Sequence, residues 1–358
     1  MKKLFLFLGF ILASQQCFAN DITLYEDNQN SVVIDGYLAG YAVYNDIKRI
    51  EKANKLDFVG YGEIHFTAEK RVDENNSFGA YIELETNPYH EKKDRVFEET
   101  YIYGEGLYGR FELGRAKNIS RKIHISAPDV GLLDIDGSYS LDYLSVPNNF
   151  TYISSTAITT DKESNKINYI SPKFYGFQIA GSYIAGASDL NGDNTLEYDK
   201  FKNGYTVSLK YSDDNLGIST GYAQFNDTNM PVSQSDKRNE YSVGAKYYTR
   251  GFQISASYKK IDEENIMGAR TQDGYALNYG IAYEFGPIEF SLSHHKSNVM
   301  GDVLNPFDDT LNLTILSTNF NIYKGVDFAT SFGRISYDAQ KEISSTGFLS
   351  AIGFMITF

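Results

Sequence analysis

The sequence predicts an all-β fold, a transmembrane antiparallel β-barrel of about 16 strands. Three observations support this prediction. Apolar and polar residues alternate with a period of two over many segments, and the connections between the segments are alternately short and long. The chain also contains 29 Tyr and 24 Phe but only 7 Pro. Membrane barrels turn alternate side chains to lipid and to the lumen, and they place aromatic side chains at both membrane interfaces.

The first 19 residues have the layout of a secretory signal peptide. Lys2 and Lys3 precede the apolar run LFLFLGFILA, and Cys17-Phe18-Ala19 predicts cleavage after Ala19. The run of about ten residues is too short to cross a bilayer as a helix. Lipidation of Cys17 is an alternative, although Gln16 occupies a position where such signals need a small residue. We therefore expect residues 20–358 to form the barrel, without any disulfide.

Net charge excludes one class of partner. The whole chain has a formal charge of −13, and removal of Lys2 and Lys3 makes this −15. Nucleic-acid binding depends on a basic surface, so no nucleic-acid partner is expected. No apolar run after residue 19 approaches the length of a transmembrane helix.

The alternation is most complete over residues 275–285. The odd positions read Tyr, Leu, Tyr, Ile, Tyr, Phe, and the even positions read Ala, Asn, Gly, Ala, Glu. A period of two is the pattern of a half-buried strand and fits no helix. We therefore expect Asn278 to face the lumen, and five side chains to face lipid: Tyr275, Leu277, Tyr279, Ile281 and Tyr283.

The same pattern defines the remaining strands. They are expected at 32–46, 58–72, 77–88, 95–107, 109–117, 166–172, 177–186, 203–213, 216–226, 238–250, 252–262, 274–285, 288–298, 311–324, 326–338 and 347–358. An even number places both termini on the periplasmic side, with short turns there and long loops outside. Residues 118–165 lack clear alternation. Two more strands at 139–146 and 150–160 would raise the count to 18, which is also even.

Two internal motifs resemble those of Gram-negative general porins. The run YIYGEGLYGRFELGR at 101–115 resembles the strand, turn and strand before their third loop. The run NYISPKFYGF at 168–177 resembles the strand and turn after it, and Phe358 resembles the terminal aromatic residue read by the outer-membrane assembly machinery. The resemblance covers essentially the whole mature chain. It implies 16 strands, an outer-membrane location, a homotrimer, and an inward-folded constriction loop at 118–165.

The resemblance also implies a function without catalysis or cofactor. Ions and small hydrophilic solutes would diffuse passively through a water-filled channel. One alternative is a substrate-selective channel for sugar or phosphate, which would need an aromatic or arginine ladder along the lumen. A barrel enzyme such as a lipase or protease is the other alternative. It requires a nucleophile and a base held together, and no motif links Ser and His here.

Candidate constriction residues come from the loop and the neighbouring strands. They are Asp129, Asp134, Asp136, Asp142, Glu63, Glu83, Arg71, Arg95, Arg110 and Arg115. General porins often place an arginine beside the Tyr of the turn motif, but Asn168 and Ile170 flank Tyr169 here. Residues 125–160 contain four Asp and no Lys or Arg. We therefore expect a weak to moderate preference for cations.

No metal centre is expected from the sequence. His294 and His295 are adjacent, so they should point to opposite faces of a strand. The segment DLNGDN at 189–194 has a calcium-loop pattern, but the twelfth position counted from Asp189 is Lys200 instead of Glu. A plain acidic loop is therefore the preferred interpretation of this segment.

Overall fold

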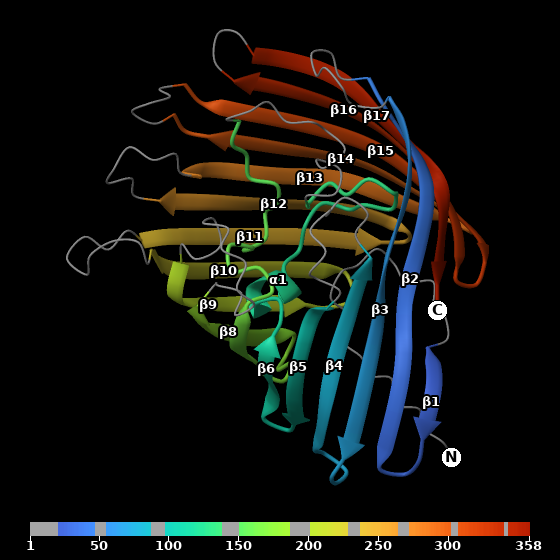
Figure 1. Ribbon diagram of the computed structural model, residues 1–358, viewed down its shortest axis with the longest axis vertical. Coiled ribbons are helices and arrows are strands. Elements are labelled where there is room, and N and C mark those ends of the chain that lie inside the picture. Colours follow the sequence, from blue (N-terminus) through green and yellow to red (C-terminus); the bar gives the residue numbers. More distant parts are fainter. Residues whose placement is uncertain are drawn as a thin grey trace.

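Antiparallel pairing runs once around the sheet and closes on itself (Figure 1). The computed structural model describes residues 21–46, 55–86, 97–137, 150–186, 201–227, 237–263, 272–301, 307–339 and 343–358. From β2 onward each strand pairs with the next, and β17 pairs back with β2 through Leu349–Thr357 and Tyr37–Asn45. The described residues form 17 strands, of which only β1 lies outside this ring, so the barrel has 16 strands, as expected.

The strands have the following bounds: β1 Ile22–Glu26, β2 Asn30–Asn45, β3 Leu56–Arg71, β4 Ser77–Thr86, β5 Phe97–Gly106, β6 Gly109–Arg115, β7 Asn165–Ile170, β8 Phe177–Gly186, β9 Phe201–Ser212, β10 Leu216–Asp227, β11 Lys237–Thr249, β12 Phe252–Glu263, β13 Gly274–Phe285, β14 Ile288–Val299, β15 Asp309–Tyr323, β16 Val326–Ala339 and β17 Ile343–Thr357. Residues 150–160 form no strand, and residues 138–149 lie outside the described part. The extra strand considered at 150–160 is therefore absent.

Strand β1 was not expected from the sequence. It pairs with residues 31–34 of β2, while Phe358 exchanges backbone hydrogen bonds with Gly36. Both β1 and the end of the chain thus lie along the same edge of β2. Because β2 extends past Phe358, β1 satisfies backbone groups that β17 does not reach.

Short connections share one end of the barrel. Arg250 and Gly251 both have positive φ, 49° and 81°, between β11 and β12. This is the conformation of a two-residue hairpin turn, and it favours glycine at its second position. Between β9 and β10, Asp213 Oδ1 accepts the backbone N–H groups of Asn215 and Leu216, both at 2.8 Å. Most long connections at the other end, including 189–194, lie outside the described residues.

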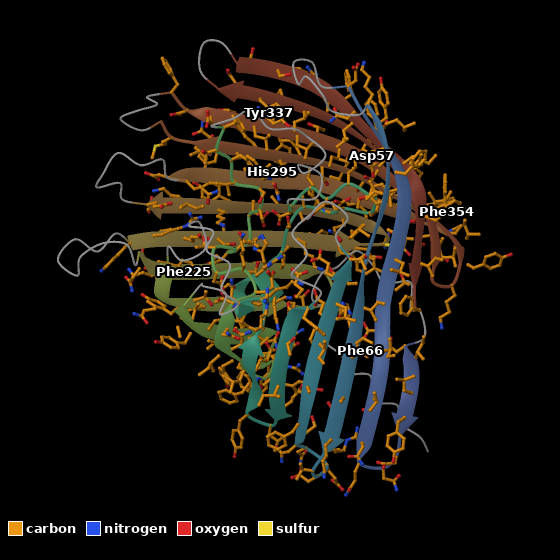
Figure 2. The ribbon with its side chains drawn as sticks, in the orientation of Figure 1. Asp57, Phe66, Phe225, His295, Tyr337 and Phe354 are labelled. Atoms are coloured by element: carbon orange, nitrogen blue, oxygen red, sulfur yellow. The ribbon has the colours of Figure 1, made fainter. Side chains whose placement is uncertain are left out.

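The inward and outward faces of β13 follow the predicted alternation. Asn278 is fully buried, whereas Tyr279, Ile281 and Tyr283 are 48%, 43% and 46% exposed. On β14, His295 is buried inside and the His294 ring contacts the Tyr279 ring outside, so the histidine pair does point to opposite faces. Exposed large apolar side chains recur around the ring, including Phe354 (Figure 2). This outer surface suits a hydrocarbon environment.

Part of the inner face of β15, β16, β17, β2 and β3 is apolar, although a membrane barrel usually turns polar side chains to its lumen. Buried apolar side chains cover that part of the wall: Tyr41, Val43, Val59, Leu311, Leu313, Ile315, Ile335, Tyr337 and Leu349. They pack against Leu132, Leu133 and Ile135 of the loop between β6 and β7. Because the loop covers this wall, the wall is protein core rather than water-lined surface.

No helix among the described residues is long and apolar enough to cross a membrane.

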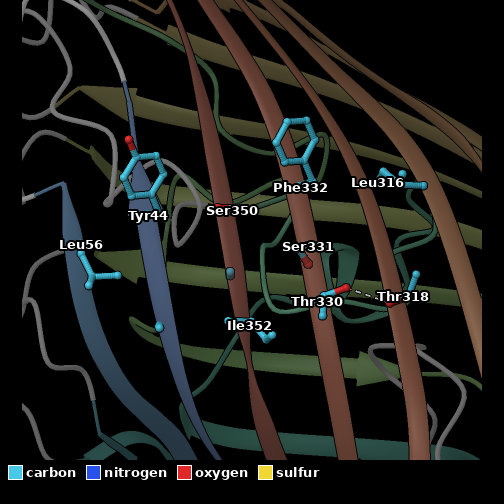
Figure 3. A pocket seen from close by; sticks show the side chains of 11 residues that line it. Tyr44, Leu56, Leu316, Thr318, Thr330, Ser331, Phe332, Ser350 and Ile352 are labelled. Atoms are coloured by element: carbon cyan, nitrogen blue, oxygen red, sulfur yellow. Dashed lines mark hydrogen bonds between the residues drawn. The ribbon is translucent and has the colours of Figure 1, made fainter.

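A groove of about 330 Å³ crosses the outer face where the chain ends meet (Figure 3). Small side chains of β2, β15, β16 and β17 form its floor, including Ala42, Thr318, Thr330 and Ser350. Tyr44 and Phe332 also line it. The Thr318 and Thr330 hydroxyls hydrogen-bond to each other at 2.9 Å, so these two outward polar groups satisfy each other.

Candidate functional site

Hydrogen bonds and an ion pair join the first and last residues of the long loop between β6 and β7. Its helix α1, Ile119–Ile123, is capped by Asn118, whose side chain accepts the backbone N–H of Arg121. The Asn118 amide donates to Ile158 O at 2.9 Å and to Asp161 Oδ1 at 2.6 Å. Asp161 in turn pairs with Lys166 at 3.1 Å, and both side chains are fully buried. The first and last segments of the loop are therefore held together where they join the barrel wall.

Serine hydroxyls of the inner wall hold the loop inside the barrel. Backbone N–H groups of the loop donate to Ser182 of β8, Ser219 of β10, Ser297 of β14 and Ser331 of β16, at 2.8 to 3.0 Å. In Figure 1 the loop runs from α1 across the interior toward β16. These hydrogen bonds satisfy buried backbone groups that have no strand partner.

A buried polar cluster joins the two limbs near the middle of the loop. Asp136 Oδ1 accepts the Thr156 N–H at 2.6 Å and the Asn278 amide at 2.6 Å. His124 Nε2 lies 3.0 Å from Thr156 Oγ1, and His295 Nε2 lies 2.9 Å from Ile153 O. Burial lowers the pKa of His124, so its imidazole is neutral near pH 7. Burial also raises the pKa of Asp136, but His124 and the hydrogen-bond donors outweigh it and the net shift is downward.

The other loop aspartates fold back on their own backbone. Asp129 accepts the N–H groups of Gly131 and Ile135 at 3.1 and 2.9 Å, and Asp134 accepts that of Asp136 at 2.9 Å. Burial raises the pKa of Asp129 to about 6 and that of Asp134 to about 7. Both side chains therefore stabilise the loop conformation. Asp142 lies outside the described residues.

Ion pairs join the start of the loop to the neighbouring wall. Near β4, β5 and β6 the wall is acidic and the start of the loop is basic. Lys117 Nζ lies 3.1 Å from Glu83 and 3.4 Å from Glu99. Lys122 Nζ lies 2.6 Å from Glu112. The sequence indicates Lys117 and Lys122 as charges that partly offset the loop aspartates, but not their glutamate partners, because those partners are set only when the loop folds back.

The three predicted arginines that the structure describes, Arg71, Arg110 and Arg115, do not gather at the loop. Arg110 lies over the Tyr103 ring and pairs with Glu105 and Glu112, each at 3.0 Å. Arg71 lies at the short-turn end of the barrel. It is in register with Ser77, which is in register with Glu105, which in turn is in register with Arg110. Arg115 is in register with the exposed Thr100 and Asn165, which is the outward face. Arg95 lies outside the described residues.

The strand register does bring Glu63 and Glu83 together, around His65. His65 Nε2 lies 3.3 Å from Glu63 and 3.9 Å from Glu83, and its Nδ1 lies 2.7 Å from Asp35. Within the described ranges, Glu63, His65 and Glu83 are the group whose ligand atoms lie close enough to hold a metal ion. The sequence predicts no metal centre. Only the alternation of residues 63 and 65 on one face hinted at this group.

A closed antiparallel barrel with an apolar outer face and a long loop bound inside defines the class of outer-membrane channels. The family described as Gram-negative porin matches residues 11–340. The chain belongs to this family, which confirms the resemblance seen in the two motifs and places the protein in the outer membrane of a Gram-negative bacterium.

Individual relatives are distant. An uncharacterized protein of Rickettsia prowazekii is 24% identical over 269 residues, covering 66% of this chain and 59% of that protein's length. The solved trimer form of OmpT, an outer membrane protein of Vibrio cholerae, is 12% identical with a TM-score of 0.65, over 92% of this chain and all of that one. Salmonella typhi OmpF is 15% identical with a TM-score of 0.66, over 94% and 100%. At such identities the structures support the fold alone.

Proposed function

We propose that the protein is a non-enzymatic, water-filled channel for passive diffusion of ions and small hydrophilic solutes, in which loop 118–165 narrows the passage. The anchoring of the loop carries this proposal. Hydrogen bonds join the loop to strands between β8 and β16, and ion pairs join it to the strands β4 to β6. Together they hold the loop across the interior. Solutes that enter the barrel must then pass beside an immobilised loop, whose lining sets size and charge selectivity.

The proposed cation preference rests on the wall rather than on the loop aspartates. Glu63, Glu83, Glu85 and Glu99 are close to one another on β3, β4 and β5. Two lysines of the loop lie beside these four carboxylates, Lys117 near Glu83 and Glu99 and Lys122 at 3.8 Å from Glu99. A passage that keeps excess carboxylate charge attracts cations and repels anions. Screening shortens this effect, to about 10 Å at 0.1 M salt, so the preference should be strongest at low salt.

Reversal potentials in a KCl gradient across a planar bilayer test this directly. We expect cation preference in the native channel and a shift toward zero in the Glu63→Gln/Glu85→Gln double variant. Asp338→Asn removes one charge from an exposed position of β16 and should leave the potential unchanged. Anion preference of the native channel, or an equal shift in the Asp338 control, would contradict the proposal.

A substrate-selective channel for an anion such as phosphate is the second candidate. Lys210 of β9 is in register with Ser219 of β10, and Lys246 of β11 with Gly217, two small residues on the inner face. The charged groups that act on Lys210 are the cations Lys246 and Lys173. Saturable block of chloride current by millimolar phosphate, lost in Lys210→Gln, would favour this candidate over the non-specific channel.

The proposed assembly is a homotrimer that packs through the outer groove of Figure 3. The related OmpT structure is a trimer form, and the groove combines small side chains with flanking aromatic rings. Small residues let membrane-embedded backbones approach closely. Ser350→Trp should therefore reduce the trimer fraction measured by sedimentation in detergent, whereas Thr220→Trp on the outer face of β10 should not. A monomeric native protein would exclude the trimer, and an unaffected Ser350→Trp would move its interface elsewhere.

A further inference from the structure

Four polar side chains meet on the inner wall where β2, β3 and β4 pair. His65 is in register with Asp35 on one side and with Glu83 on the other, and Glu63 lies two residues earlier on the same face. The side chains of Glu63, His65 and Glu83 are 15%, 19% and 4% exposed. Cross-strand pairing of three rigid strands therefore sets the positions of all four groups.

Ligand spacing in this group is close to that of a bound metal. Zinc bonds of about 2.0–2.1 Å in a tetrahedral site place neighbouring ligand atoms about 3.3 Å apart. His65 Nε2 lies 3.3 Å from Glu63 Oε2 and 3.9 Å from Glu83 Oε2, and all ligand atoms lie within 4.8 Å of one another. Small side-chain rotations bring the third ligand to the required distance.

Both ring nitrogens of His65 have carboxylate partners in the ion-free site. Nδ1 lies 2.7 Å from Asp35 Oδ1 and Nε2 lies 3.3 Å from Glu63 Oε2. A bound cation would displace the proton on Nε2, while the Nδ1–H stays bound to Asp35 and keeps Nε2 directed at the metal. A carboxylate behind a histidine in this way is the usual outer shell of a metal-bound imidazole. Lys117 contacts Oε1 of Glu83, and the Tyr81 hydroxyl takes only one lone pair of Oε2. The lysine thus neutralises charge without occupying the ligand position.

We propose that Glu63, His65 and Glu83 bind a divalent transition-metal cation such as Zn²⁺ on the inner wall, with Asp35 orienting the imidazole. A water molecule would take the fourth position, as in zinc sites with three protein ligands. Nitrogen and carboxylate oxygen together select a borderline cation over Ca²⁺ or Mg²⁺, which prefer oxygen ligands alone. The site does not depend on the sign of the ion selectivity proposed above.

Calorimetric titration of the purified full-length barrel in detergent with Zn²⁺ tests the proposal. We expect one saturable site per chain, loss of that site in His65→Gln and in Glu63→Gln, and binding weakened by about 10- to 100-fold in Asp35→Asn. His294→Gln on the outer face is the matched control and should bind as the native protein does. Co²⁺ should give the absorption bands of a four-coordinate ion, which the His65 variant lacks.

Circular dichroism confirms that each variant is a folded barrel, and Glu63→Gln serves if the His65 variant does not fold. Binding of equal strength in the native, His65 and Glu63 proteins would overturn the proposal, as would the lack of a saturable site in the native protein. Conductance recorded on the same samples separates this outcome from failure of the channel function. A channel that conducts without binding Zn²⁺ contradicts only the metal site.

Discussion

Single buried residues decide how the loop responds to pH. Asp134 has a pKa of about 7 in the folded loop against an ordinary 3.8, because burial penalises its charged form. The folded state thus binds this proton more tightly, so Asp134 makes loop docking most favourable below pH 4 and less favourable as pH rises to 7. The difference of about 3 between the two pKa values of Asp134 corresponds to at most about 4 kcal/mol of loop-docking free energy.

We therefore expect the amides of Ile135 and Asp136 to exchange with solvent faster at pH 8 than at pH 5, beyond the intrinsic change in exchange rate. Asp134→Asn keeps an oxygen for the Asp136 N–H and should abolish most of this pH dependence. Asp213→Asn alters an exposed carboxylate in the turn between β9 and β10 and should leave the pH dependence of exchange unchanged. Equal pH dependence in native protein and Asp134→Asn would show that another group titrates.

Lys166 gives a second prediction at this scale. It pairs with Asp161 and also donates to Lys162 O at 2.9 Å, with no solvent contact. Lys166→Met leaves a buried carboxylate without its cation, which should cost about 3–5 kcal/mol of loop docking. Protection of the Ser164 amide from exchange measures this loss, because its N–H donates to Asp161 O. Adding Asp161→Asn should restore much of the protection, and no restoration would mean that the lysine acts through packing.

At the scale of one element, β13 separates the two faces of the wall. Ile281 is 43% exposed on the outer face, and replacing it with Arg should cost about 2–4 kcal/mol near the membrane centre. Gln253, on the paired strand β12, is on the inner face and only half-buried, so Gln253→Arg should cost much less. Urea titration of folding into lipid vesicles measures both, and a larger cost at Gln253 would reverse the assigned faces.

Asn278 is less suitable as the inner-face partner in that experiment, although the sequence makes it the obvious choice. Its amide is bound to Asp136 and lies 3.0 Å from Ser126 Oγ, so an arginine there would displace the loop. The strand determines that residue 278 points inward. The loop determines that the inward space at this point is filled.

For the whole molecule, the arrangement of connections predicts the orientation in the membrane. Short turns should lie in the periplasm and long loops outside. A cysteine at Asp308, on a long connection, should react with an impermeant reagent on intact cells, whereas one at Asp214 should not. Lysed cells provide the control, since both sites should react there. If only the cysteine at position 214 reacted on intact cells, the predicted orientation of the barrel would be reversed.

Alternation by itself determined the barrel. Side chains two residues apart share a face regardless of their neighbours, so the strands and the faces of Asn278, Ile281 and the His294–His295 pair were predictable from residue order. Terminal features were less local. Strand β1 forms because β2 extends past Phe358, and that offset depends on which residues of the first and last barrel strands pair.

Only the tertiary structure decided which charged groups meet. Asp35, His65 and Glu83 come together through the register of three strands, and a shift of one residue would turn each of them to the other face. The sequence predicts Asp129 and Asp134 as constriction residues, and only the structure shows that both accept backbone N–H groups of their own loop. The sequence contains the charges, but burial and cross-strand pairing determine which of them reach water, because those depend on residues far apart in the chain.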